Sequence, residues 1–180
     1  LGCAILIHVV SRGKVSWLLR KAVEMMTGIP TVISGFVGIF LLVRLMRELF
    51  AAGSGMCVLS ASLMLSLLVS PTMILFFCDS FDRVPSSYGK AALAMGATEI
   101  QRFLYITLPN AWPGVVIGTT LSFGRALGDT LIALMIAGNA VQAPDSLLDS
   151  ARTLTSHIAL VFAADYDSLE FKAIYACGIF

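Results

Sequence analysis

The chain has little charge for its length. Only 13% of its 180 residues are Asp, Glu, Lys or Arg, whereas a soluble domain carries about 25%. Basic and acidic residues nearly balance, at 12 and 11, so the net charge is +1 and no basic field points to nucleic acid. In their place 58% of the residues are apolar, and the mean hydropathy is +0.90. This composition predicts a membrane protein.

Cysteine is also sparse. The four residues are Cys3, Cys57, Cys78 and Cys177. They are scattered and show neither metal-ligand nor disulfide spacing, so we interpret them as small residues of membrane helices. The chain also lacks the glycine-rich loop with which Walker-type proteins hold nucleotide phosphates. We therefore expect no ATP site and no other cofactor in this chain.

The chain has no initiator Met, and both of its ends lie inside apolar runs. Residues 1–10 make up about half of the ~20 residues that cross a bilayer, and residues 173–180 begin another such run. We therefore expect a fragment whose first and last helices are cut short.

Three apolar runs are long enough to cross a membrane, at residues 25–43, 56–78 and 111–137. The fold class that we expect is all-α, a polytopic transmembrane helical bundle forming one domain over residues 1–180. Small residues recur in these runs and would let helices approach closely. They are Gly35 and Gly38 in the first run, and the GxxxG pairs Gly114–Gly118 and Gly124–Gly128 in the third.

The polar segments between the runs predict an orientation. Segments 11–24 and 79–109 hold more Lys and Arg than segments 44–55 and 138–172. Crossing parity independently puts the first two on one side of the membrane. Because cytoplasmic loops are richer in Lys and Arg, we expect 11–24 and 79–109 to face the cytoplasm and the acid-rich 138–172 to face outward.

Two of these segments also contain apolar stretches. In 11–24, Trp17 and Leu18 lie among Arg12, Lys14, Arg20 and Lys21. This pattern fits an amphipathic helix at the lipid headgroups and equally a plain charged loop. Residues 154–164 are apolar but too few to span a membrane, so we expect a surface or re-entrant helix there.

Residues 84–109 form a connector with a helical pattern over 88–104. The Ser86–Ser87 pair is a plausible N-cap for its first helix. Gly96 is expected to separate two short helices, because a glycine inside a helix costs about 1 kcal/mol relative to alanine. Pro109 is expected to end the second helix.

The third apolar run contains two opposite charges. Arg125 and Asp129 are four residues apart, so on one helix their side chains would meet. Each costs about 2.5–3.5 kcal/mol at mid-membrane on insertion scales, so they are expected to pair and to face the bundle interior. One interpretation is a packing salt bridge. The other is a lining of the solute path, where an arginine can bind an oxyanion through two hydrogen bonds.

Two stretches of the connector resemble the cytoplasmic "EAA" loop of ABC importer permeases. They are Ala91-Ala92-x-x-x-Gly96 and Ile106-x-Leu108-Pro109. In that family the loop contains the coupling helix, which docks on the ATP-hydrolysing subunit. Lys90 stands where the family usually has glutamate, which removes one expected polar contact. The resemblance assigns coupling to Lys90, Ala91, Ala92, Gly96, Ala97, Leu108 and Pro109 within residues 84–109.

Other stretches resemble permeases of phosphate-specific ABC importers, and the PstC type of subunit more than the PstA type. They are Gly28-Ile29-Pro30-Thr31-Val32, Val84-Pro85-Ser86-Ser87-Tyr88, Gly124-Arg125-Ala126-Leu127-Gly128-Asp129-Thr130, Met135-Ile136-Ala137-Gly138-Asn139 and Thr153-Leu154-Thr155-Ser156-His157-Ile158-Ala159-Leu160. The resemblance covers nearly the whole chain. Asp129 stands where glutamate is more usual, which keeps the charge and shortens the side chain.

This resemblance implies a type I permease fold of six helices, of which the chain holds about five. It implies a path lined by Arg125, Asp129 and Thr130 in the bacterial inner membrane. The implied partners are a PstA-like sister permease, an ABC ATPase dimer that binds ATP and magnesium, and a periplasmic phosphate-binding protein.

Three other functions stay open at this point. The first is a permease for another oxyanion, such as molybdate or sulfate. The second is a membrane enzyme acting on phosphate or lipid, which would need a nucleophile or base beside Arg125, where Asp129 is the one candidate. The third is a component that signals phosphate status without transporting phosphate.

Overall fold

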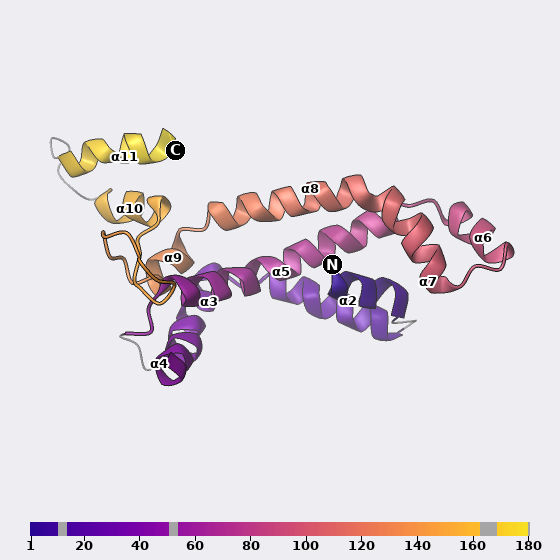
Figure 1. The fold of residues 1–180 in the computed structure, drawn as a ribbon, viewed down its shortest axis with the longest axis horizontal. Helices are drawn as coiled ribbons and strands as arrows, with labels where there is room; N and C mark the ends of the chain where they lie inside the picture. Colours follow the sequence, from indigo (N-terminus) through magenta and orange to yellow (C-terminus); the bar gives the residue numbers. More distant parts are fainter. Residues whose placement is uncertain (11–13, 51–53, 163–168, 180) are drawn as a thin grey trace. The chain divides into compact units, whose positions relative to one another are not determined.

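The structure is a computed structural model, and it describes residues 1–10, 14–50, 54–162 and 169–179. Every regular element in these ranges is helical (Figure 1), which confirms the expected all-α class. Arg12 of the first polar segment, and Asp165 and Asp167 of the last, lie outside the described residues.

Most of the helices are short. In chain order the elements are α1 (Gly2–Ile5), η1 (Leu6–Val10), α2 (Lys14–Thr27), α3 (Thr31–Gly38), η2 (Ile39–Val43), α4 (Arg44–Phe50), α5 (Val58–Asp82), α6 (Ser86–Ala94), α7 (Glu99–Arg102), η3 (Phe103–Thr107), α8 (Leu108–Leu127), α9 (Leu131–Ile136), α10 (Leu154–Val161) and α11 (Leu169–Ile179). The three η segments are π-helical turns of five residues. Segment 14–24 is thus helical, which favours the amphipathic helix over the plain loop.

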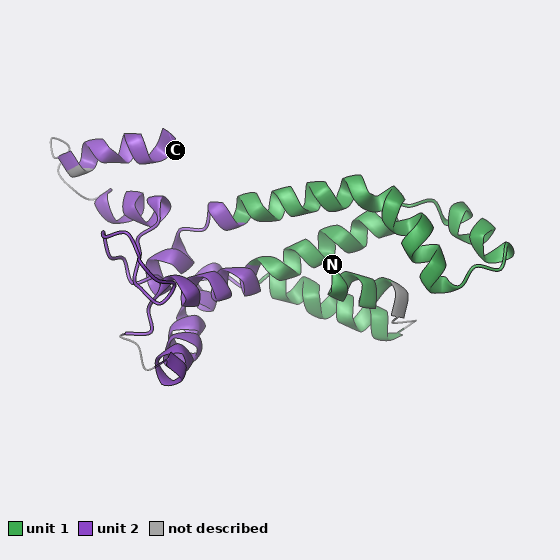
Figure 2. Cartoon of the chain, in the orientation of Figure 1, with its two compact units in different colours: residues 1–28, 69–125 green, residues 29–68, 126–180 purple. Residues whose placement is uncertain are grey.

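The chain divides into two compact units (Figure 2). Unit 1 contains residues 1–28 and 69–125, and unit 2 contains residues 29–68 and 126–180. Two of the three boundaries fall inside helices, since residues 68 and 69 belong to α5, and residues 125 and 126 belong to α8. The third lies between α2 and α3.

The core of unit 1 is built around aromatic rings from α5 and η3. Phe81 and Phe103 are almost fully buried, and their ring centroids lie 5.1 Å apart in an edge-to-face arrangement. This is a favoured geometry for aromatic pairs. The rest of this core comes from α1, η1, α5 and α8, through Ala4, Ile7, Phe77, Cys78, Ala111 and Val115.

The core of unit 2 joins η2, α5 and α9 through Val43, Met64, Ile132 and Ile136. Two glycines make its close packing possible. A Cβ on Gly35 would lie 2.7 Å from Sδ of Met135, and one on Gly38 would lie 2.7 Å from Cδ1 of Ile136. The expectation that these glycines permit close approach is therefore confirmed.

Of the helices in the described residues, α5 alone is long and apolar enough by itself to cross a membrane. It confirms the run predicted at 56–78 and continues to Asp82. The run at 25–43 is broken, because α2 ends at Thr27 and α3 begins at Thr31, directly after Pro30. Proline lacks a backbone donor and fixes its own backbone angle, so it suits the start of a helix rather than its interior.

The run at 111–137 is also not one helix. Its helix α8 begins earlier, at Leu108, and ends at Leu127, and α9 starts only at Leu131. Within the predicted segment 154–164, residues Leu154–Val161 form α10, which begins with a capping box made by Thr153 and Ser156. Residues 163 and 164 of that segment lie outside the described residues.

Candidate solute path and coupling connector

Arg125 lies two residues before the end of α8, in unit 1. Its Nη1 donates a hydrogen bond of 3.1 Å to the hydroxyl of Thr72 on α5. The side chain is exposed, and none of the ion pairs among the described residues includes it. A guanidinium oriented by a neutral hydroxyl keeps its charge and most of its donors for an anion.

Asp129 does not sit one turn further along the same helix. Because α8 ends at Leu127, the prediction that Arg125 and Asp129 share a helix face is wrong. Asp129 belongs to unit 2, where its Oδ1 accepts a 2.9 Å hydrogen bond from the N–H of Ile132 at the start of α9. A short carboxylate readily satisfies such free N–H groups at a helix start, and this competes with a continuous helix.

Thr130 directly precedes α9, at its N-cap position. Its backbone carbonyl accepts from the N–H of Leu134 at 2.9 Å, and its side chain is partly buried. The predicted path residues therefore flank a break between two helices. The role of Arg125, Asp129 and Thr130 in a path stays a prediction.

The connector forms two short helices joined by a tight turn, as expected. Gly96 has φ +85° and follows α6, and α7 begins after Thr98. Thr98 and Gln101 form a capping box, each side chain accepting from the other's backbone N–H. The left-handed conformation at Gly96 favours glycine, because other residues carry a Cβ that crowds the backbone there.

Two details of the connector differ from the prediction. The residue that precedes α6 is Pro85, and no side chain caps this helix, so Ser86–Ser87 is not the N-cap. Pro109 does not end a helix, since η3 continues directly into α8 at Leu108. Pro109 lacks a backbone N–H. It lies just after the π-helical turn η3, where the backbone hydrogen bonds change to the α-helical pattern, and so it does not interrupt a continuous α-helical run.

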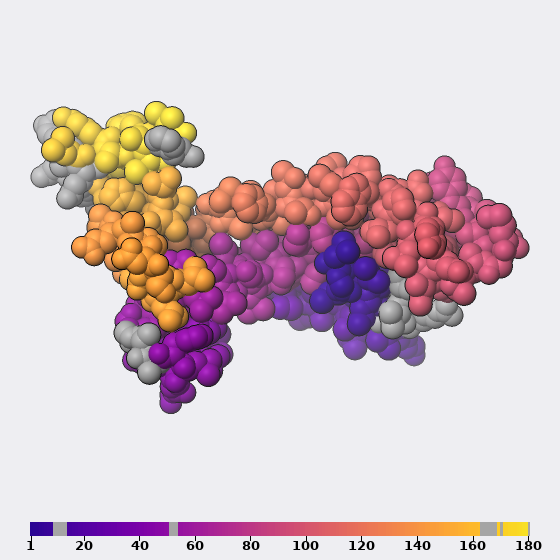
Figure 3. All heavy atoms as spheres, in the orientation of Figure 1, coloured from indigo at the N-terminus to yellow at the C-terminus, as the bar shows by residue number. Residues whose placement is uncertain are grey.

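The motif residues of the connector divide by exposure. Ala92 is buried, and Ala97 and Leu108 are partly buried, whereas Lys90, Ala91, Gly96 and Pro109 are exposed. Large apolar side chains are also exposed, with Met95 at 81% and Tyr105 at 78%. The connector is uncovered on the face seen in Figure 3, where it is drawn in rose. Exposed apolar groups of this kind mark a surface suited to another protein.

Ion pairs at the base of the connector were not predicted. Arg20 of α2 binds two carboxylates of α5, donating from Nη1 to Asp82 at 2.6 Å and from Nη2 to Asp79. The bond to Asp82 raises the pKa of Arg20. His8 lies 3.3 Å from the same Asp82. The available signal was the spacing of the two aspartates, which puts both on one helix face at the end of an apolar run.

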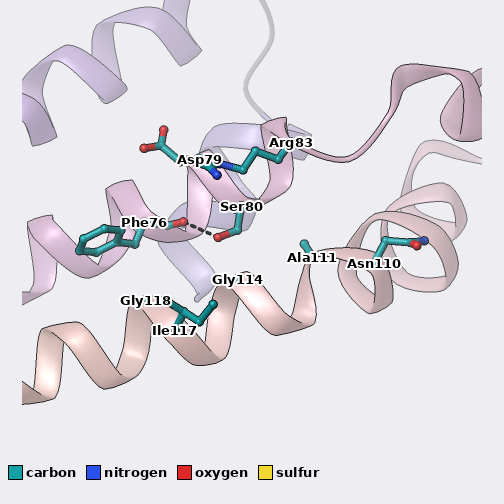
Figure 4. Close-up of a pocket in the computed structure, with 9 residues that line it drawn as sticks. All are labelled: Phe76, Asp79, Ser80, Arg83, Asn110, Ala111, Gly114, Ile117 and Gly118. Atoms are coloured by element: carbon teal, nitrogen blue, oxygen red, sulfur yellow. Dashed lines mark hydrogen bonds between the residues drawn. The ribbon is translucent and has the colours of Figure 1, made fainter.

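A pocket of about 320 Å³ opens beside this cluster, between the end of α5 and the start of α8 (Figure 4). Phe76, Asp79, Ser80 and Arg83 line it from α5 and the residue after it. On the α8 side, its lining includes Gly114 and Gly118. A Cβ on Gly114 would lie 2.5 Å from Oγ of Ser80, and a Cβ on Gly118 would lie 2.8 Å from Cβ of Phe76, so a larger residue at either position would clash with α5. The close approach predicted for the Gly114–Gly118 pair is confirmed, whereas Gly124 meets nothing within 4 Å.

The chain matches the family model described as "Binding-protein-dependent transport system inner membrane component" over residues 1–164. It is 31% identical to the "Probable ABC transporter permease protein YqgH" of Bacillus subtilis (strain 168), covering 90% of this chain and 53% of that relative. It is 32% identical to the "Phosphate transport system permease protein PstC" of Pasteurella multocida (strain Pm70), covering 91% and 58%.

A third relative is the "Probable phosphate transport system permease protein PstC" of Methanocaldococcus jannaschii, at 29% identity over 87% of this chain and 55% of that protein. The chain thus spans little more than half the length of these relatives. No solved structure matches it.

Proposed function

Since the chain belongs to the family of binding-protein-dependent transport system inner membrane components, we propose that it is a permease subunit of an ATP-driven phosphate importer. The observation that carries the substrate is the identity of about 30% to proteins named as phosphate transport permeases, over most of this chain. It acts as a transporter subunit and performs no chemical step on the solute.

The solute path in this proposal passes Arg125. A charged guanidinium with a hydroxyl as its only hydrogen-bond partner among the described side chains suits transient binding of an oxyanion. Asp129 and Thr130 lie beside the helix break that follows. A carboxylate near the path weakens anion binding by repulsion, so phosphate can also leave.

Coupling in this proposal passes through residues 84–109, which face the cytoplasm. The exposed apolar side chains Tyr88, Met95, Ile100 and Tyr105 form the docking surface for an ABC ATPase. ATP and magnesium bind to that ATPase, and this chain binds no cofactor. Closure of the ATPase dimer moves the connector, and the helices rock between an inward-open and an outward-open arrangement.

The remaining partners follow from the same proposal. The chain pairs with a PstA-like sister permease in the bacterial inner membrane, which it crosses several times. A periplasmic phosphate-binding protein delivers the solute to the outward-facing segments. The family description supports the binding protein among these partners, since it names a binding-protein-dependent system.

Two measurements test the proposal. Labelled phosphate uptake is compared between a strain lacking the gene and the same strain with the gene restored, and the permease is purified to ask whether an ATPase subunit comes with it. We expect restored uptake and phosphate-stimulated ATP hydrolysis. Competition by molybdate or sulfate in preference to phosphate would assign another oxyanion. Unchanged uptake together with altered phosphate-dependent gene expression would assign a signalling role.

A further inference from the structure

Unit 2 contains a second pocket of about 320 Å³ that the proposed path does not use. Its walls are mainly aliphatic side chains of α5 and α9, among them Val58, Leu65 and Ile132. Arg152 and Thr153 close its rim, at the start of α10. Arg152 is the single charged side chain among the residues that line it.

A specific backbone fold holds Arg152 at this rim. Gly138 and Asn139 both have positive φ, at +86° and +60°, and turn the chain after α9. The N–H of Asn139 then donates to the carbonyl of Ala151 at 3.2 Å, and the N–H of Ala151 donates to the carbonyl of Ala137 at 3.0 Å. These two bonds fix residue 152 beside the end of α9.

Among the described residues, the guanidinium of Arg152 contacts a backbone carbonyl and an imidazole ring. Its Nε donates to the backbone carbonyl of Asn139 at 3.1 Å, and its Nη1 lies 3.4 Å from Nδ1 of His157. No ion pair in the described part of the chain includes it. The side chain is partly buried, and a partly buried charge without a counter-charge is costly unless an anion is supplied from outside.

We propose that this pocket is an oxyanion site on the outward side of the permease, with Arg152 as its anion-binding residue. The inference rests on the proposed phosphate uptake and adds a second station to it. The start of α10 adds favourable dipole there, since Thr153 lines the pocket and N-caps that helix. The aliphatic walls strengthen the attraction between the guanidinium and the anion by excluding water.

The test is equilibrium binding of labelled inorganic phosphate to the purified permease–ATPase complex, in micelles without phospholipid. The complex carries Arg125→Ala, so that binding at the proposed path is silent. Arg152→Gln is compared with Arg152→Lys and with Ala61→Leu, which enlarges another side chain that lines the pocket. The control is Arg44→Ala, because Arg44 is also predicted to face outward but is exposed and paired with Glu48.

We expect Arg152→Gln to weaken binding about tenfold to a hundredfold, the range for a lost charge-assisted hydrogen bond. Arg152→Lys keeps the charge and should lose less, Ala61→Leu should also weaken binding, and Arg44→Ala should not. Equal binding by Arg152→Gln and its parent would overturn the site while leaving phosphate uptake by the wild type unaffected. Binding that depends on Arg152 in a wild type that takes up no phosphate would instead refute the proposed function alone.

Two other outcomes also overturn the site. If phosphate binding is unchanged but uptake with the binding protein is impaired, Arg152 contacts that protein rather than the solute. If a short-chain phosphatidylglycerol occupies the pocket and inorganic phosphate does not displace it, the phosphate group recognised there belongs to a lipid headgroup.

Discussion

The contact of α5 with α8 gives a prediction that uses two glycines of one helix. A Cβ on Gly118 would lie 2.8 Å from Cβ of Phe76, whereas a Cβ on Gly124 would meet nothing within 4 Å. Replacing either glycine by alanine adds about 1 kcal/mol of helix propensity. That gain is common to both variants, so the difference between them isolates the cost of the contact.

The cost can be worked from the distance. Carbon atoms pack best at about 3.5–4.0 Å, so α5 and α8 must move apart by roughly 1 Å at this point. The neighbouring atom is Cβ of Phe76, which is fixed to the backbone and cannot swing aside. Overpacking of this kind costs about 1–3 kcal/mol, so Gly118→Ala should be less stable than Gly124→Ala by that amount.

The assay is reversible unfolding of the purified complex in mixed micelles, with phosphate uptake measured in parallel. Uptake should also fall in Gly118→Ala, because Arg125 of α8 donates to Thr72 of α5 and separation of these helices lengthens that bond. If Gly118→Ala is as stable as Gly124→Ala, the close packing of the two helices at this glycine is refuted.

Three further predictions concern coupling and the path. Arg125→Ala should abolish phosphate uptake while the complex still assembles, and normal uptake by this variant would remove Arg125 from the path. Gly96→Asp places a side chain at φ +85°, so we expect ATP hydrolysis that no longer drives uptake; full coupling would argue against the connector. Arg20→Ala should lower the free energy of unfolding by less than about 1 kcal/mol in the same unfolding assay, because the ion pairs of Arg20 are partly exposed. Reversing the pair, as Arg20→Asp with Asp82→Arg, should restore most of that loss, and no restoration would show that the ion pair is not stabilising.

The general architecture followed directly from the sequence. A low charge content and long apolar runs predicted a helical membrane protein, and the relatives confirm the resemblance to phosphate-specific permeases. Gly96 and the Gly114–Gly118 pair were also predicted correctly. The two glycine features depend on a local property, namely a positive φ or the absence of a side chain, which can be read from a single sequence.

The errors have a different origin. Hydropathy alone joined residues 111–137 into one span, but Asp129 bonds to the backbone at the start of α9, and the helix is interrupted there. Hydropathy reports the environment of a residue and does not report the partner of a side chain. The spacing of Asp79 and Asp82 puts both on one helix face, but their partner Arg20 lies about 60 positions away, so no local pattern identifies that partner.

The start of α5 has backbone partners of its own. The N–H of Val58 donates to the carbonyl of Asp149 at 3.0 Å, and the N–H of Leu59 donates to the carbonyl of Leu147 at 2.9 Å. These are donors that most helices leave to water or headgroups. The helix has 25 residues and is about 37 Å long, which exceeds a hydrocarbon layer of about 30 Å. The first backbone N–H groups of α5 are bonded within the chain and need no water. This end of the helix can therefore lie at different depths in bilayers of different thickness, which lets the protein tolerate hydrophobic mismatch.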